Sequence, residues 1–150
     1  MIKFNFKEFQ TRHLGKIFRP SARVVFYSKN VKIETELLVD PGADITLIPK
    51  TFGQYLGLKR KGVEKLKRLF GVGKGGVPVL FRDINIIIGK YVIKAKIAWI
   101  QDNSNILLLG RYNVFDEFNI EFRQKDRITV FKKGNEDIVK NSELIKNGFF

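Results

Sequence analysis

Asp40 is the carboxylate whose surroundings best suit chemistry. It follows three apolar residues and precedes Pro41 and Gly42. Proline favours extended geometry in the residue before it, and a Pro-Gly pair suits the central positions of a type II turn. This pattern predicts a carboxylate at the end of a buried strand, on a tight turn. Burial of an unpaired carboxylate is costly. Asp40 is therefore either an ordinary turn residue that bonds a nearby backbone N–H, or an acid that is kept at this position for a function.

The segments around Asp40 are mostly of strand type. Apolar and polar residues alternate over 23–27 and 31–39, which predicts two strands joined across 28–30. Short helices are expected at 49–57 and 112–118, with a further helical turn over 63–69. Residues rich in β-branched and aromatic types predict the remaining strands, at 84–88, 91–100, 106–109, 118–122 and 128–131.

Two segments share a pattern of apolar strand, glycine turn and expected helix. The first is Leu37-Leu38-Val39-Asp40-Pro41-Gly42-Ala43-Asp44-Ile45-Thr46-Leu47-Ile48-Pro49, and the second is Ile106-Leu107-Leu108-Leu109-Gly110-Arg111. The first resembles the active-site segment of retropepsin-like aspartic peptidases of the single-domain, dimeric, retroviral-protease type. The second resembles the second signature of that family. The resemblance covers roughly residues 20–131, so 1–19 is expected to be an N-terminal extension and 132–150 a C-terminal tail.

The resemblance implies an all-β fold, a closed or partly closed retropepsin-like barrel with two or three short helices. It also implies an aspartic endopeptidase in which the Asp40 residues of a homodimer meet at the two-fold axis. One carboxylate is ionised and activates water, and the other is protonated and polarises the scissile carbonyl. No metal or organic cofactor is required. Besides catalytic Asp40, the resemblance assigns an active-site turn of Pro41, Gly42 and Ala43, a structural ion pair of Asp44 with Arg111, and a second-half signature at Leu109 and Gly110.

A glycine-rich segment lies between the two motifs. Gly71, Gly73 and Gly76 form a literal G-x-G-x-x-G, but a dinucleotide site needs a helix to begin there. Pro78 and the apolar residues after it predict a strand instead. A hairpin tip matches the mobile flap of the resembled family, which closes over an extended peptide substrate. The expected flap residues are Gly71, Val72, Gly73, Lys74, Gly75 and Gly76.

Composition leaves a second interpretation open. The chain has 28 Lys and Arg against 15 Asp and Glu, a formal charge of +13, and such an excess attracts polyanions. Pro41 stands where the resembled family has Thr or Ser, and proline offers neither a hydroxyl nor an N–H. The alternative is therefore a catalytically weak or silent basic module on the same fold, binding nucleic acid, acidic surfaces or peptide.

Other chemistries find little support. The chain has no cysteine, which excludes disulfides, thiolate zinc sites and cysteine nucleophiles. The one histidine, His13, lacks the context of a Ser-His-Asp triad, and the 14 phenylalanines are better explained as core than as a base-stacking platform. No segment approaches the roughly 18 apolar residues that cross a bilayer. We expect a cytoplasmic protein without a transmembrane segment.

Overall fold

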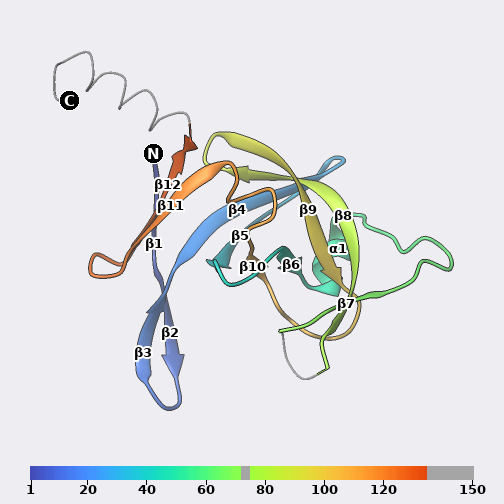
Figure 1. Ribbon diagram of the computed structural model, residues 1–150, viewed down its shortest axis with the longest axis horizontal. Helices are drawn as coiled ribbons and strands as arrows, with labels where there is room; N and C mark the ends of the chain where they lie inside the picture. Colours follow the sequence, from blue (N-terminus) through green and yellow to red (C-terminus); the bar gives the residue numbers. More distant parts are fainter. Residues whose placement is uncertain (72–74, 135–150) are drawn as a thin grey trace.

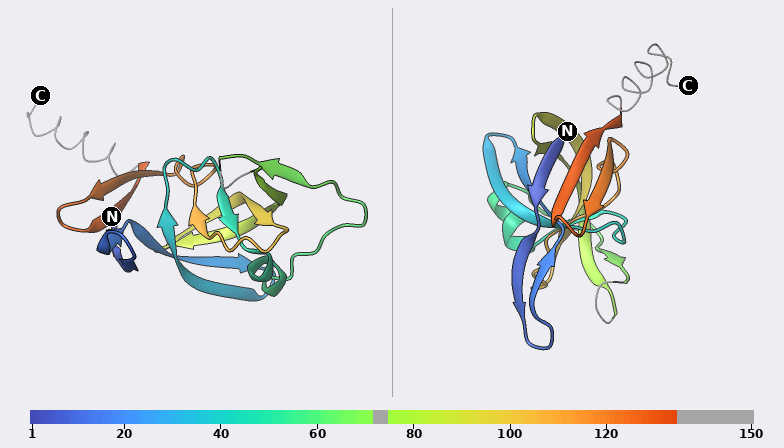
Figure 2. Two further views of the ribbon diagram at one scale, coloured as in Figure 1. Left: turned by 90° about the horizontal axis from the view of Figure 1, so that it is seen from below. Right: turned by 90° about the vertical axis from the view of Figure 1, so that its left-hand side faces the viewer.

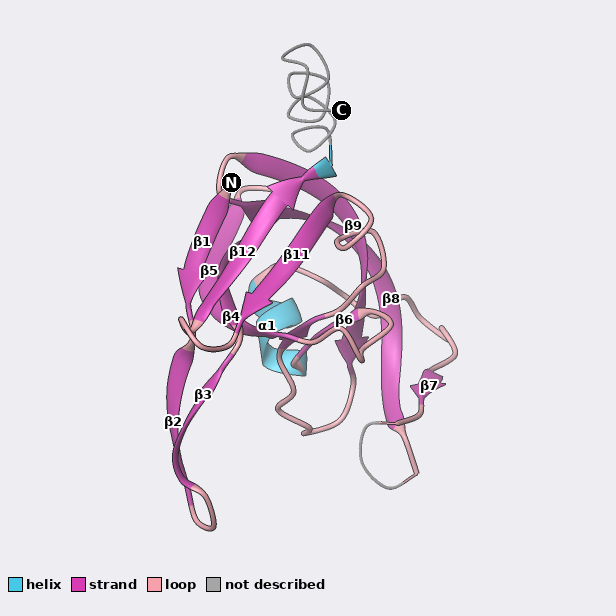
Figure 3. Cartoon of the chain, turned by 60° about the vertical axis from the view of Figure 1, so that its left-hand side comes forward, coloured by secondary structure: helices cyan, strands magenta, loops and turns pink. Residues whose placement is uncertain are grey.

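The computed structural model describes residues 1–71 and 75–134. Strands dominate it, and one helix lies among them (Figure 3). The elements are β1 (Ile2–Asn5), β2 (Lys7–Thr11), β3 (Gly15–Arg19), β4 (Ser21–Ser28), β5 (Val31–Val39), β6 (Thr46–Ile48), α1 (Lys50–Tyr55), β7 (Lys67–Leu69), β8 (Val77–Ile88), β9 (Tyr91–Ile100), β10 (Leu108–Leu109), β11 (Phe118–Arg123) and β12 (Ile128–Lys133). Within the described ranges, no helix has the length and apolar character needed to span a membrane.

Six strands close into a barrel (Figure 1). Their order is β4-β5-β10-β6-β9-β8, and the pairing of Val25 with Ile87 brings β8 back to β4. The all-β prediction is thus confirmed, and the barrel is closed. Alternating side chains of the strands fill its interior, among them Val24, Phe26 and Leu37, which are fully or almost fully buried.

The hairpin predicted across 28–30 is confirmed, and a second hairpin joins β8 to β9. Strands β4 and β5 pair antiparallel from Ser21 with Leu38 to Ser28 with Val31. Strands β8 and β9 pair along ten residues on either side of the Gly89-Lys90 turn, where Gly89 has φ 59°. Glycine takes this left-handed conformation without the steric cost that a Cβ would bring.

The two similar motifs lie next to each other. Strand β10 pairs in parallel with the end of β5, placing Leu108 opposite Leu38 and Leu109 opposite Val39. On its other side β10 pairs antiparallel with β6. The chain therefore reaches Asp40 and Gly110 at the same end of two adjacent strands, which brings the two signatures together.

Two smaller parts lie outside the barrel. Strands β1, β12 and β11 form a three-stranded sheet, and the β2–β3 hairpin extends away from the body (Figures 1 and 2). The hairpin touches the terminal sheet through Arg127, whose guanidinium lies 3.7 Å from the centre of the Phe18 ring. Strand β1 belongs to the N-terminal segment and pairs with β12. The limits of the three expected segments stay a prediction, and 135–150 of the expected tail lies outside the described residues.

The helix predictions were right once and wrong twice. Helix α1 begins after Pro49 and ends before Gly57, as expected. Residues 112–117 form turns and Phe118 begins β11, because Asn113 adopts φ 63° and its side-chain oxygen accepts a hydrogen bond from the Lys96 N–H, so the helical path breaks there. Residues 63–69 contain strand β7 in place of the expected helical turn. The described residues hold one helix, in keeping with an all-β fold that has few helices.

Candidate active site

The Asp40 turn is held by hydrogen bonds on every side. The Asp40 N–H donates to Leu109 O at 3.0 Å, which ties the end of β5 to β10. The Asp40 carbonyl accepts the Ala43 N–H at 3.1 Å, and its carboxylate Oδ1 accepts the Gly42 N–H at 2.9 Å. The carboxylate is half-buried, less than predicted, because Pro41 and Gly42 lie exposed beside it. One carboxylate oxygen is thereby fixed by the turn itself.

The turn differs in type from the prediction. A type II turn needs a positive φ at Gly42, and Gly42 does not have one. The side-chain bond from Asp40 to the Gly42 N–H favours a tighter Asx-type arrangement. Space also favours glycine, since a Cβ at this position would lie 3.1 Å from Asp40 Oδ1, so the carboxylate would have to shift slightly. A larger residue at position 42 would push the carboxylate aside.

A buried contact between the two signatures also holds the segment that follows the turn. Gly110 packs so tightly on the backbone of Ile45 that a Cβ on Gly110 would overlap it. The Gly110 N–H donates to the hydroxyl of fully buried Thr46 at 3.0 Å. We did not predict a role for Thr46 from the sequence. The available signal was one hydroxyl residue within an apolar strand, which must find a hydrogen-bond partner when buried.

The residues after the turn bind the second signature mainly through their backbone. The Arg111 N–H donates to Ala43 O at 3.0 Å, and the Tyr112 N–H donates to Asp44 O at 2.8 Å. The side chains of Arg111 and Asp44 also pair, Nη2 to Oδ1 at 2.7 Å. These side chains are 55% and 88% exposed. An ion pair this exposed contributes little to stability, so the backbone bonds carry most of the connection.

Strands β7 and β8 form a hairpin on either side of the glycine-rich segment. Strands β7 and β8 pair antiparallel from Lys67 with Val79 to Leu69 with Val77. The dinucleotide interpretation needed a helix at this position, and the structure has a strand. Gly71, Gly75 and Gly76 all have positive φ. Val72, Gly73 and Lys74 lie outside the described residues.

An apolar cluster joins this hairpin to the Asp40 segment. Its buried members include Ile45 and Leu47, just after the site turn, and Val77 and Val79 at the base of the hairpin. Half-buried apolar side chains pack against these residues, namely Leu69, Phe81, Ile106 and Leu108. The hairpin is therefore anchored on the same packed layer that follows Asp40.

The loop before the hairpin is held by a bidentate ion pair. Arg82 donates from Nη1 to Glu64 Oε2 at 2.8 Å and from Nη2 to Glu64 Oε1 at 2.6 Å. Arg82 Nη2 also donates to Lys59 O at 2.8 Å. Hydrogen bonding from Arg82, with help from the Lys61 N–H, lowers the pKa of Glu64 to about 2. The loop 57–66 is thus tied to strand β8 at a fixed place.

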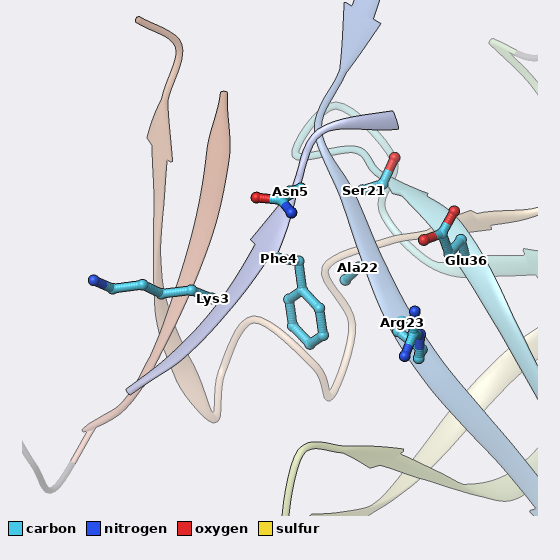
Figure 4. A pocket seen from close by; sticks show the side chains of 7 residues that line it. All are labelled: Lys3, Phe4, Asn5, Ser21, Ala22, Arg23 and Glu36. Carbon is cyan, nitrogen blue, oxygen red and sulfur yellow. The ribbon is translucent and has the colours of Figure 1, made fainter. Parts of the chain in front are cut away.

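A polar hollow lies between β1 and β4 (Figure 4). Its volume is about 280 Å³. Lys3 and Arg23 line it together with the carboxylate of Glu36. Arg23 also pairs with Glu34 at 3.4 Å, so cations and carboxylates are balanced around this hollow.

Comparisons with known proteins identify the fold. A retropepsin-like aspartic protease from Rickettsia conorii is 22% identical, with a TM-score of 0.53 over 87% of this chain and 99% of that one. The EIAV protease complexed with the inhibitor HBY-793 is 24% identical, with a TM-score of 0.45 over 67% of this chain and 88% of that one. The retroviral protease-like domain of Ddi1 from Leishmania major is 17% identical, with a TM-score of 0.48 over 78% and 98%. No protein-family model and no curated protein matches the chain.

This chain is thus an all-β barrel in which one aspartate lies on a turn at the end of a barrel strand, next to the second signature. The Rickettsia structure, which matches over most of both chains, names this class of barrel: the fold of this chain is retropepsin-like.

Proposed function

We propose that two copies of this chain form an aspartic endopeptidase, with Asp40 from each copy at a two-fold axis. Hydrolysis by this route needs two close carboxylates that share one proton. The ionised carboxylate takes a proton from water as the water attacks the scissile carbonyl. The protonated carboxylate donates a hydrogen bond to the carbonyl oxygen. Activity is therefore expected in acid solution, where the pair holds a single proton.

The main support for the proposal is the position of Asp40, on an exposed turn at the end of a strand of the retropepsin-like barrel. The chain fixes one carboxylate oxygen through the Gly42 N–H and leaves the turn exposed at Pro41 and Gly42. A single copy supplies one acid where the reaction needs two. A two-fold partner would supply the second acid and cover the exposed turn.

The substrate in this proposal is an extended peptide with apolar side chains. The half-buried residues Ile106 and Leu108 lie on the apolar layer between the Asp40 segment and the β7–β8 hairpin. They would offer pockets to alternate side chains of an extended chain. The hairpin, whose tip is rich in glycine, would act as the flap that closes over the peptide and excludes water.

The test compares two aspartate-to-asparagine variants. We expect pepstatin-sensitive cleavage of an unfolded protein by the parent chain at acid pH and its loss in Asp40→Asn. Asp116→Asn is the matched control, because Asp116 is an exposed carboxylate on the 112–117 turns and is not among the residues assigned to catalysis. Sedimentation establishes the dimer for all three proteins. A confirmed dimer that cleaves nothing across the acid range, or an Asp40→Asn variant that still cleaves, would refute the proposal.

A second candidate function follows from Pro41. This residue brings neither a hydroxyl nor an N–H to the exposed turn, so its contribution to a dimer across that turn is small. A catalytically silent module that binds peptide or nucleic acid would account for the substitution. Pro41→Thr separates the two functions: gains in both dimerisation and cleavage support the peptidase, whereas extended peptides that are bound but left intact, with or without threonine, support the module.

A further inference from the structure

A second pocket lies at the base of the loop 57–66. Its volume is about 530 Å³, which is the size of a site for a small organic molecule. It is lined by residues from helix α1, from the loop and from the end of β9, namely Lys50, Gln54, Gly57, Leu58, Lys59, Arg60, Leu66, Trp99 and Gln101. The catalytic proposal uses none of these residues.

The walls of this pocket are fixed by hydrogen bonds. The Trp99 indole N–H donates to Lys50 O at 3.0 Å, which holds α1 against β9. The Leu58 N–H donates to Gly53 O at 2.9 Å, and Lys59 O accepts the guanidinium of Arg82. The pocket is therefore built before any ligand arrives, and a preformed site loses little freedom on binding.

The charged residues that line the pocket are all cations. Lys50, Lys59 and Arg60 line it, and its described lining includes no Asp or Glu. Neither lysine pairs with a carboxylate anywhere in residues 1–71 and 75–134. The nearest acid along the loop, Glu64, is engaged by Arg82. This pocket thus differs from the hollow between β1 and β4, where Glu36 and Glu34 balance the cations.

The flanking loop has the same character. Six of the ten residues 59–68 are lysine or arginine. Val63 is 98% exposed and Leu66 is 40% exposed, so apolar side chains stand among the cations. An anionic group with an apolar body would satisfy both features of this surface.

We infer that this pocket binds a phosphate group carried by an organic molecule. Two lysines and an arginine suit a doubly charged phosphate, for which lysine and arginine are the usual ligands. Inorganic phosphate alone would leave much of the volume empty, so the organic body lies against Leu58, Leu66 and Trp99. The body belongs either to a soluble phosphate ester or to the head group of an anionic lipid, beside which Val63 would enter the bilayer surface.

Trp99, the only tryptophan of the chain, reports on the pocket directly. We expect phenyl phosphate to change the Trp99 fluorescence saturably, and neutral phenol to do so far more weakly. Lys50→Gln with Lys59→Gln should weaken the phenyl phosphate affinity by about tenfold or more, since charge-assisted hydrogen bonds are lost. Lys94→Gln with Lys125→Gln is the control, because it removes the same charge from exposed positions outside the pocket.

Vesicles separate the two sources of phosphate. Cosedimentation with phosphatidylcholine vesicles that contain phosphatidic acid, reduced by the Lys50 and Lys59 changes, assigns the lipid head group. Phenyl phosphate binding without cosedimentation assigns a soluble ester. The inference is overturned if phenyl phosphate does not saturate the signal, or if both double variants weaken binding equally. Asp40→Asn should bind phenyl phosphate as the parent chain does. The phosphate-site proposal and the peptidase proposal are therefore tested independently of each other.

Discussion

Replacing Thr46 with valine tests the buried bond between the two signatures. Valine has nearly the shape of threonine but no hydroxyl, so the Gly110 N–H loses its acceptor at 3.0 Å. Both residues are buried. A buried donor left without a partner costs about 1–3 kcal/mol, and we expect Thr46→Val to lower the free energy of unfolding by that amount.

Thr129 offers a matched control in the same chain. It is also fully buried in a strand, but its hydroxyl has no hydrogen-bond partner among the described residues. Thr129→Val removes a buried hydroxyl that makes no hydrogen bond with the described residues, and valine is favoured in strands. We expect this variant to be as stable as the parent, or more stable by up to about 1–3 kcal/mol.

Urea unfolding of the three proteins at one concentration measures both changes, with the concentration held fixed because subunit association would alter apparent stability. The predicted order of midpoints is Thr129→Val at or above the parent and Thr46→Val below it. Equal losses in both variants would mean that valine is disfavoured in this barrel for reasons of packing. An unchanged Thr46→Val would refute the role given to the Thr46 hydroxyl.

Three further predictions concern the supporting structure. The ion pair with Arg82 lowers the pKa of Glu64 from 4.5 to about 2. The pair therefore stabilises the fold fully above about pH 4.5 and loses this effect as the pH falls toward 2. In thermal unfolding, Glu64→Gln should make stability depend less on pH between about 4.5 and 2. Gly53→Ala should cost about 1–3 kcal/mol in urea, because the new Cβ would overlap the Trp99 indole. Arg111→Gln should cost less than about 1 kcal/mol in the same assay, since its ion pair is exposed.

Much of the fold could be predicted because some strands alternate apolar and polar residues and others are rich in β-branched and aromatic types. Segment 31–39 places Leu37 and Val39 inward, and the structure buries both. Helix α1 carried standard signals at each end, with Pro49 before it and Gly57 after it. Such signals are local, so a single sequence reveals them.

The failures occurred where contacts distant in sequence decide the structure. Residues 112–118 have helical spacing, but Asn113 bonds the Lys96 N–H of strand β9 and turns the chain. At the site, the sequence indicated Asp40 and its two signatures. It did not indicate that Thr46 accepts the Gly110 N–H across 64 positions. Neither the pairing nor the burial of that hydroxyl can be read from its neighbours in the sequence.

Closure of the barrel limits where this strongly basic chain can associate with itself. Because β8 returns to β4, strand edges that another chain could extend lie mainly in the outer parts, such as β7, the β2–β3 hairpin and the terminal sheet. These edges carry charged side chains, among them Lys67 and the pairs of Lys16 with Glu8 and Arg123 with Glu121, and charged edge residues discourage unplanned strand addition. Charged side chains on the exposed edges are therefore expected to disfavour aggregation, which leaves ordered assembly to other surfaces of the chain.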